Sequence, residues 1–264
     1  MTSPEATDLR DLALGVAREA AALVRGRRAQ PVEVADTKSS VVDVVTEADR
    51  ASEQLIRSLL ARARPEDAFL GEEGSDDDGT SGVRWVVDPI DGTVNFLYGL
   101  PQYAVSIAAE RGGQAVAGVV VNAATGVEYA AALGAGATRD GRPIGVRGPA
   151  PLAERLIITG FSYDADRRAV QAAALVRLLP RVRDVRRLGS CALDLCHVAE
   201  GMADGYVEEA VNIWDHAAGA LIAREAGART VLLPGAGGLE ALVAAPAAGF
   251  DELLAAVTDA GFLA

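Results

Sequence analysis

A change in the pattern of apolar residues at residues 145–154 limits the folds open to this chain more than any other feature. Before this change, strand-like segments follow one another through tight turns. Residues 103–110 and 114–121 are joined at Arg111-Gly112-Gly113, and Asp140-Gly141 is a second hairpin signal. The first half of the chain therefore predicts an antiparallel sheet.

After the change, strand-like and helical segments alternate. An apolar strand at residues 156–159 precedes a helical pattern over Ala165–Leu179, and a later helical pattern covers Trp214–Ala226. We therefore expect an α/β (α+β) chain with two subdomains. Residues 1–147 would form an N-terminal α+β subdomain that carries most of the acidic site residues, and residues 148–264 a C-terminal α/β subdomain that carries the rest.

The composition limits the partners and the location of the protein. A formal net charge of -12 disfavours nucleic acid and anionic membranes as partners. No apolar run has the length of a transmembrane helix, and the first residues lack the features of a signal peptide. Cys191 and Cys196 fall on different faces of the helix expected there, so we expect reduced cysteines and a cytoplasmic protein. The absence of GxxxxGK[ST] and GxSxG motifs excludes a P-loop and a serine-hydrolase elbow.

The segment WVVDPIDGTVNF, residues 85–96, places two acids directly after an apolar strand. Buried carboxylates are unfavourable by several kcal/mol unless a positive charge compensates them. Pro89 favours a bend, so Asp88 and Asp91 can converge on one point with the Ile90 carbonyl between them. The segment therefore predicts a bound cation.

Other acids flank apolar segments elsewhere in the chain: Asp49, Glu72, Glu73 and Asp215. Carboxylate oxygens are the ligands that Mg²⁺ and Ca²⁺ prefer. Carboxylates from several elements suit a two-metal site, in which ions about 3.5–4 Å apart hold the attacking and leaving oxygens of a displacement at phosphorus. Gly92 would let the backbone approach a ligand, and a helix starting at Gly92-Thr93 would direct N–H groups at a phosphate.

Each acid taken alone also has a structural explanation. Asp49 lies three residues after Thr46, which is the spacing of a helix capping box. Asp215 is a favourable charge in the first turn of a helix. Glu72-Glu73 could belong to a solvated loop, and DPIDGT could be a turn. The complete set favours the catalytic interpretation.

Five segments together resemble the inositol monophosphatase family of magnesium-dependent phosphatases. They occur in the family order between Lys38 and Ala228: VVDVVTEAD, LGEEG, WVVDPIDGTVNF, RLGSCALDLCHVAEGMADGYVE and WDHAAGALIAREAGA. The combination of DPIDGT with a later WDxAxG is specific, and the chain is most similar to the bacterial inositol-1-monophosphatase branch. The resemblance implies a layered αβαβα sandwich, assembly as a homodimer and inhibition by lithium.

The resemblance also implies roles for individual residues. Two to three Mg²⁺ ions per site are expected, with these ligands: Glu72, Asp88, the Ile90 carbonyl, Asp91 and Asp215. Three residues are expected to orient and deprotonate the attacking water: Glu72, Thr93 and Asp49. The implied substrate-binding residues are Lys38, Asp91, Gly92, Thr93, Gly189, Ser190, Cys191 and Glu208. Among these, Glu208 matches the carboxylate that binds the hydroxyls of inositol.

Three positions depart from the family pattern, which often has alanine at Cys191, histidine at Asn212 and an aromatic residue at Val207. All three are on the sugar side, so the departures concern substrate identity. We expect a Mg²⁺-dependent phosphomonoesterase that hydrolyses inositol 1-phosphate. Alternative substrates are histidinol phosphate, fructose 1,6-bisphosphate, 3′-phosphonucleotides and glycerol 2-phosphate. An alternative of a different class is a non-catalytic binding protein that acts through a partner.

Overall fold

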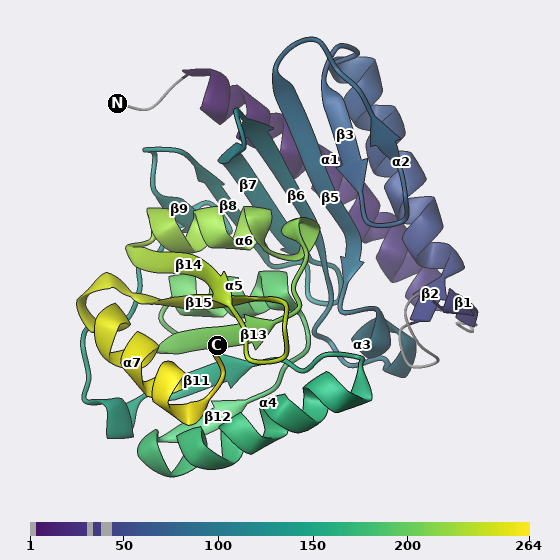
Figure 1. Cartoon of the computed structure of the whole chain (residues 1–264). Helices are drawn as coiled ribbons and strands as arrows, with labels where there is room; N and C mark the ends of the chain where they lie inside the picture. Colours follow the sequence, from purple (N-terminus) through teal and green to yellow (C-terminus); the bar gives the residue numbers. More distant parts are fainter. Residues whose placement is uncertain (1–3, 31–33, 38–43) are drawn as a thin grey trace.

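The chain folds into five layers in the order helix, sheet, helix, sheet, helix, which is the αβαβα sandwich expected from the sequence (Figure 1). This computed structural model describes residues 4–30, 34–37 and 44–264. Within these residues the strands form an eight-stranded sheet, a five-stranded sheet and a two-stranded hairpin. The hairpin pairs β1 (Val34–Thr37) with β2 (Val44–Thr46). Lys38, for which the family resemblance implies a role in substrate binding, lies outside the described residues.

The eight-stranded sheet is built from the first half of the chain, in the order β10-β9-β8-β7-β6-β5-β3-β4. Its strands are β3 (Ala68–Gly71), β4 (Asp76–Asp77), β5 (Val83–Asp91), β6 (Ala104–Arg111), β7 (Gln114–Asn122), β8 (Glu128–Ala132), β9 (Ala137–Arg139) and β10 (Arg142–Pro143). Only β3 and β5 run parallel, and the other neighbours are antiparallel. The predicted antiparallel sheet is confirmed, and so are the hairpins at Arg111-Gly112-Gly113 and Asp140-Gly141.

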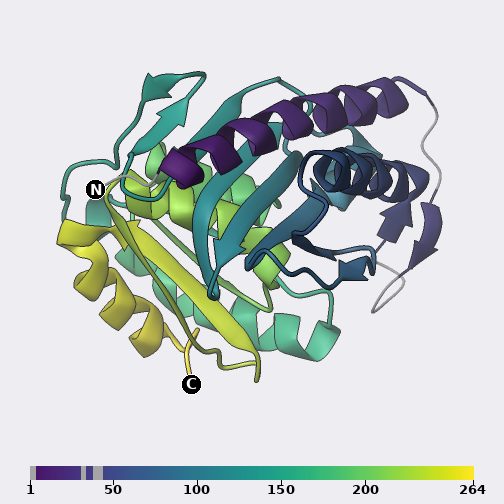
Figure 2. The same ribbon diagram turned by 90° about the horizontal axis from the view of Figure 1, so that it is seen from above.

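Both faces of this sheet are covered by helices, which explains why its central strands are apolar on both sides. On one face, Trp85 and Ile107 pack against α1 (Pro4–Arg28) and α2 (Glu47–Ala63). On the other face, Val86 and Val120 pack against α5 (Cys191–Ala199) and α6 (Ile213–Glu225). Figure 2 shows α1 and α2 lying side by side on the outer face.

The five-stranded sheet comes from the second half, in the order β12-β11-β13-β15-β14. Its strands are β11 (Leu156–Thr159), β12 (Asp184–Arg186), β13 (Gly205–Glu209), β14 (Ala228–Pro234) and β15 (Glu240–Pro246). One face meets α5, and the other is covered by α4 (Ala165–Leu178) and α7 (Phe250–Ala260). Helices α5 and α6 therefore form the central layer. Strand β11 is parallel to β12 and β13, which confirms the α/β character of this half.

The element boundaries are close to those expected, with one informative difference. The sequence predicts that Pro89 ends the strand that begins near Trp85. Strand β5 instead continues to Asp91, and its register with β6 shifts between Asp88 and Asp91. The proline is accommodated in this irregular stretch, where the regular ladder of hydrogen bonds is interrupted. Of the helices among the described residues, none has the length and hydropathy needed to cross a membrane. The division at residues 147 and 148 stays a prediction.

Candidate active site

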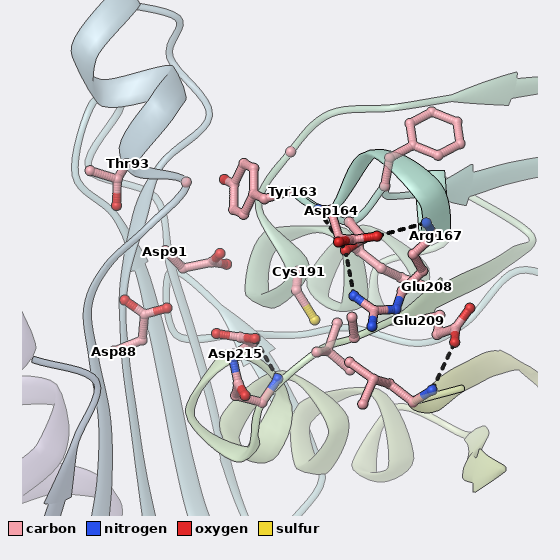
Figure 3. A pocket seen from close by; sticks show the side chains of 18 of the residues that line it. Asp88, Asp91, Thr93, Tyr163, Asp164, Arg167, Cys191, Glu208, Glu209 and Asp215 are labelled. Atoms are coloured by element: carbon pink, nitrogen blue, oxygen red, sulfur yellow. Dashed lines mark hydrogen bonds between the residues drawn. The ribbon is translucent and has the colours of Figure 1, made fainter. Parts of the chain in front are cut away.

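A cavity of about 800 Å³ lies where the ends of β5 and β13 meet the first turns of α5 and α6 (Figure 3). Residues 161–165, Arg167 and Arg168 also line it. Ten of the predicted site residues line it: Glu72, Asp88, Ile90, Asp91, Gly92, Thr93, Gly189, Cys191, Glu208 and Asp215. Asp49 and Ser190, which are also predicted site residues, are fully buried and lie behind its wall. Segments distant in the sequence thus converge on one site.

The irregular end of β5 sets the positions of its two aspartates. Asp88 and Asp91 are 2% and 8% exposed, and the Ile90 N–H donates to Oδ1 of Asp88 over 3.0 Å. Gly92 follows with a left-handed φ of 94°, and a Cβ there would lie 2.8 Å from the carbonyl oxygen of Gln102. Only glycine meets both conditions without strain. The short helix α3 (Thr93–Tyr98) then begins at the cavity.

Asp91 is tied to the N-terminus of α5. Its Oδ2 accepts a hydrogen bond from the Ser190 hydroxyl at 2.6 Å and another from the Ala192 N–H at 2.7 Å. The Ser190 side chain also caps α5 through the Leu193 N–H. Ser190 therefore contacts the acid beside the cavity, whereas its neighbours Gly189 and Cys191 reach the cavity itself.

Asp49 caps helix α2 and also contacts Thr93 at the cavity. Its Oδ2 accepts from the Thr46 N–H at 2.8 Å, which confirms the capping box of α2. Its Oδ1 accepts from the Thr93 hydroxyl at 3.1 Å, and the same hydroxyl lies 3.1 Å from the Ile90 carbonyl oxygen. Burial raises the pKa of Asp49 to about 6, against the lowering effect of its bonds to Thr46. Asp49 is therefore a carboxylate held behind Thr93, with a pKa of about 6.

The loop that carries Glu72 is held by a residue that we did not identify from the sequence. Glu53 on α2 is 3% exposed, and its carboxylate accepts from the Glu73 N–H at 2.8 Å and the Ser75 hydroxyl at 2.6 Å. The available signal was the helical spacing. Glu53 lies four residues after Asp49 and three before Ile56, on the buried face of its helix.

Asp215 enters the cavity from the first turn of α6. Its Oδ2 accepts from the Asn212 N–H at 2.6 Å, so the predicted helix-start role is confirmed. The side chain also lines the cavity, as Figure 3 shows. Asp215 therefore resembles Asp49: one side chain both stabilises the start of a helix and reaches the site.

The carboxylates in the cavity raise one another's pKa. Burial raises the pKa of Asp88 well above its usual value, and the charges of Glu72, Asp91 and Asp215 raise it further. Burial likewise raises the pKa of Asp215, with Asp91 and Glu72 adding to the effect. Burial raises the pKa of Asp91 to about 6, although the bond from Ser190 lowers it. The cluster is therefore short of positive charge.

The donor chemistry of this cluster suits hard divalent cations. Four carboxylates and the Ile90 carbonyl supply only oxygen donors, which Mg²⁺ and Ca²⁺ prefer. Among the described residues, no group of three or more His, Cys, Asp or Glu side chains has the geometry of a formed metal site. The fit therefore rests on the type of donors and on their mutual repulsion, which a cation would relieve.

The opposite wall of the cavity belongs to the second half of the chain. Glu208 on β13 lines it, and its Oε2 accepts from the Tyr206 hydroxyl at 2.8 Å. Burial raises the pKa of Glu208, while the bond from Tyr206 and the charge of Arg187 lower it. The thiols of Cys191 and Cys196 are free, buried and raised in pKa by burial, so the expected absence of a disulfide is confirmed.

Several residues that line this wall were not predicted as site residues from the sequence. They include Phe161, Tyr163, Arg167, Arg168, Arg187 and Trp214. Arginines in the first turn of a surface helix look like ordinary solvated residues, and only the fold places them at the cavity. The local signals available were the position of Arg187 just before Gly189-Ser190 and that of Trp214 directly before Asp215.

The whole chain is similar to known proteins. Residues 5–260 match the model of the inositol monophosphatase family. The inositol-1-monophosphatase of Mycobacterium bovis is 49% identical, covering 97% of this chain and 96% of its own length. The Nus factor SuhB of Pasteurella multocida is 37% identical, covering 82% of each chain.

The solved structure of Mycobacterium tuberculosis SuhB superposes with a TM-score of 0.85 at 46% identity. The match covers 99% of this chain and 100% of that one. Both the sequence segments and the layered architecture therefore agree with a single family. The chain is a phosphatase that belongs to the inositol monophosphatase family.

Proposed function

We propose that this protein is a Mg²⁺-dependent phosphomonoesterase that hydrolyses inositol 1-phosphate to inositol and phosphate. The observation that supports this most is the convergence of Glu72, Asp88, Asp91 and Asp215 with Glu208 around one cavity. The name of the M. bovis relative, inositol-1-monophosphatase, supports the same substrate. Metal dependence is general in the family, and the choice of Mg²⁺ and of two to three ions is part of the proposal.

The ligands of the metal would be Glu72, Asp88, the Ile90 carbonyl, Asp91 and Asp215. Bound Mg²⁺ would neutralise the phosphate oxygens and make a bound water more acidic. The residues themselves hold this site in shape. Ser190 and the Ala192 N–H fix one oxygen of Asp91, and the Asn212 N–H fixes one oxygen of Asp215.

The catalytic residues would be Glu72, Thr93 and Asp49. The Thr93 hydroxyl lies at the cavity and is bonded to Asp49, so it can orient a water for in-line attack on phosphorus. Because burial raises the pKa of Asp49 to about 6, this carboxylate is a stronger base than a solvated aspartate. The N–H groups of Gly92 and Thr93 would bind the phosphate, and Lys38, outside the described residues, stays a predicted substrate contact.

Glu208 supports a substrate that is rich in hydroxyl groups. A carboxylate that accepts hydrogen bonds from substrate hydroxyls rejects analogues that lack them. Histidinol phosphate, fructose 1,6-bisphosphate, 3′-phosphonucleotides and glycerol 2-phosphate remain the alternative substrates. A panel of these esters and inositol 1-phosphate, ranked by kcat/KM with and without Mg²⁺, tests the proposal. We expect inositol 1-phosphate to rank first. No metal-dependent phosphate release from any ester would contradict the proposal.

A second candidate function is a binding role exerted through a partner. The observation that favours it is the relative named Nus factor SuhB, at 37% identity. Asp91→Asn separates the two functions, because it removes a proposed metal ligand and keeps a side chain of the same shape. A cellular phenotype that persists in this variant, with turnover abolished, would favour the binding role.

Assembly and location complete the proposal. We infer a homodimer, as the resemblance implies, and light scattering coupled to size-exclusion chromatography would give twice the 27.2 kDa of one chain. A mass of one chain would contradict it. The cytoplasmic location stays a prediction, for which the two buried free thiols are the supporting observation. Lithium inhibition is expected from the weak binding of a hard monovalent cation among the carboxylates.

A further inference from the structure

Gly160 lies directly against the carboxylate of Glu208. A Cβ built on Gly160 would lie 1.9 Å from Cδ and Oε1 of Glu208 and 2.0 Å from Oε2. The carboxylate therefore fills the space that any other residue at position 160 would need. Gly160 itself is buried at the end of β11 and follows Thr159, which pairs with Val207 on β13.

The register of the two strands explains this contact. Strands β11 and β13 are parallel, with Ile158 opposite Tyr206 and Thr159 opposite Val207. One step further along, Gly160 comes beside Glu208. Because side chains alternate between faces, Tyr206 and Glu208 share the face that packs toward α5. On this face the Tyr206 hydroxyl donates to Oε2 of Glu208 over 2.8 Å.

The other oxygen of Glu208 is left for a ligand. Within the residues that the structure describes, Oε1 accepts no hydrogen bond, although the side chain lines the cavity. Tyr206 holds the carboxylate from one side, and Gly160 lets it lie close to the sheet. Tyr206 is fully buried, so the donor cannot move away without disturbing the core.

We propose that Gly160 and Tyr206 are positioning residues that fix the Glu208 carboxylate, and that they thereby set which substrate hydroxyl the enzyme accepts. The inference rests on the proposed function, because it assigns the cavity a polyol monophosphate as substrate. It goes further in making Gly160 a determinant of specificity, although this residue has no side chain to contact the ligand.

Gly160 differs in kind from the glycine at the phosphate side. Gly92 has a left-handed φ and would bring a Cβ against backbone oxygen, so its replacement distorts the chain. Gly160 does not have a φ in that region, and the three atoms nearest to its added Cβ belong to the end of a flexible side chain. Gly160→Ala should therefore fold normally and displace the Glu208 carboxylate.

The test uses the full chain with Mg²⁺ and two substrates, inositol 1-phosphate and phenyl phosphate, which has no hydroxyl groups. Gly160→Ala should raise KM for inositol 1-phosphate by about 10- to 100-fold, the range expected when hydrogen bonds to a charged group are lost. We expect kcat to change little, because such binding is uniform through the reaction. For phenyl phosphate, kcat/KM should stay within about twofold of the wild type.

Three further variants make the test specific. Gly15→Ala is the matched control, because no atom lies within 4 Å of a Cβ added on that exposed face of α1. Glu208→Gln should raise KM for inositol 1-phosphate in the same way as Gly160→Ala. In the double variant the two effects should fall well short of additive, because Gly160 acts through Glu208. Tyr206→Phe should raise the same KM by a smaller factor and serves if Gly160→Ala does not fold.

The outcomes separate this inference from the proposed function. The inference is overturned if Glu208→Gln raises KM while Gly160→Ala, folded by its melting curve, leaves it unchanged. It is also overturned if the effects of Gly160→Ala and Glu208→Gln add fully. A wild-type protein that releases phosphate from neither ester overturns the proposed function, and the inference with it.

Discussion

Two glycine–glutamate contacts, one on each side of the cavity, hold their carboxylates in different ways. A Cβ on Gly71 would lie 2.2 Å from Oε2 of Glu53, much as one on Gly160 would meet Glu208. Glu53 is 3% exposed, and both of its carboxylate oxygens accept hydrogen bonds from the loop that carries Glu72. The donors are the Glu73 N–H and the Ser75 hydroxyl. Within the part of the chain that the structure describes, Glu208 accepts one hydrogen bond, from the Tyr206 hydroxyl, and its side chain lines the cavity.

This difference indicates that the two halves of the chain have different roles at the cavity. On the side of the eight-stranded sheet, buried carboxylates bind backbone groups and hold other acids in place. On the side of the five-stranded sheet, the Glu208 carboxylate lines the cavity, and among the described residues its Oε1 accepts no hydrogen bond. We therefore expect changes at the Glu53 contact to affect the chemical step with every substrate, and changes at the Glu208 contact to affect the choice of substrate.

The largest expected effect is that of Gly71→Ala. The added methyl group would push the Glu53 carboxylate off the Glu72 loop, and displacing a catalytic group by about 1 Å can lower the rate about 100-fold. We expect kcat to fall by about this factor for inositol 1-phosphate and phenyl phosphate alike. Crowding a packed site should also lower the free energy of unfolding by about 1–3 kcal/mol. Steady-state kinetics and thermal melting measure both quantities.

Gly26→Ala is the control for this variant, because no atom lies within 4 Å of the added Cβ and the residue is in helix α1. Its kcat should equal that of the wild type. If Gly71→Ala instead changed only the ratio between the two substrates, the division between the two sides of the cavity would be wrong.

A smaller effect is expected at Thr93. Thr93→Val removes the hydroxyl that donates a hydrogen bond to Asp49. If Thr93 orients the attacking water as proposed, kcat should fall by roughly 10- to 100-fold. Thr93→Ser keeps the hydroxyl and is the matched control, with a kcat near that of the wild type. Equal kcat values for the valine and serine variants would show that the Thr93 hydroxyl has no catalytic role.

The sequence predicted the acid side of the cavity far better than the opposite side, for a physical reason. Asp88 and Asp91 interrupt an apolar strand within a few residues, so their unusual environment shows locally. The fold also followed from local patterns, because tight turns and alternating segments are short-range signals. Contacts such as Gly160–Glu208 join residues 48 positions apart, the same separation as the Thr159–Val207 bond beside them, and leave no local pattern. Glu53 had only its helical spacing to reveal it.

Ser190 shows a different limit. Its neighbours Gly189 and Cys191 line the cavity as expected, but its hydroxyl turns inward to Asp91 and to the first turn of α5. A residue in a motif can thus act by positioning another side chain of the site, without contacting the ligand itself. The direction of one side chain depends on donors from distant segments, which the motif does not contain.

The smallest expected effect is on stability as a function of pH. Burial raises the pKa of Asp91 from 3.8 to about 6, so without metal the folded protein binds more protons than the unfolded one between these values. The contribution of Asp91 to the free energy of unfolding therefore falls as pH rises from about 4 to about 6. In EDTA, the melting temperature of Asp91→Asn should therefore rise relative to that of the wild type over this range. The expected difference is a few degrees, because 1 kcal/mol of stability shifts the melting temperature by about 2–4 °C.

Added Mg²⁺ should reverse this difference, because it binds the wild-type carboxylates and stabilises the folded state by mass action. Melting curves from pH 4 to pH 7 with EDTA and with Mg²⁺ measure both effects. A difference in melting temperature between the two proteins that does not vary with pH would show that the surroundings do not raise the pKa of Asp91.

We propose that the acid cluster of this cavity performs metal-dependent hydrolysis of a polyol monophosphate. The decisive experiment measures phosphate release from inositol 1-phosphate over a Mg²⁺ titration, for the wild type and Asp91→Asn side by side. We expect the wild type to be inactive in EDTA and its activity to saturate with Mg²⁺, and we expect the folded variant to stay inactive at every Mg²⁺ concentration. Turnover that is independent of Mg²⁺, or equal in the two proteins, would contradict it.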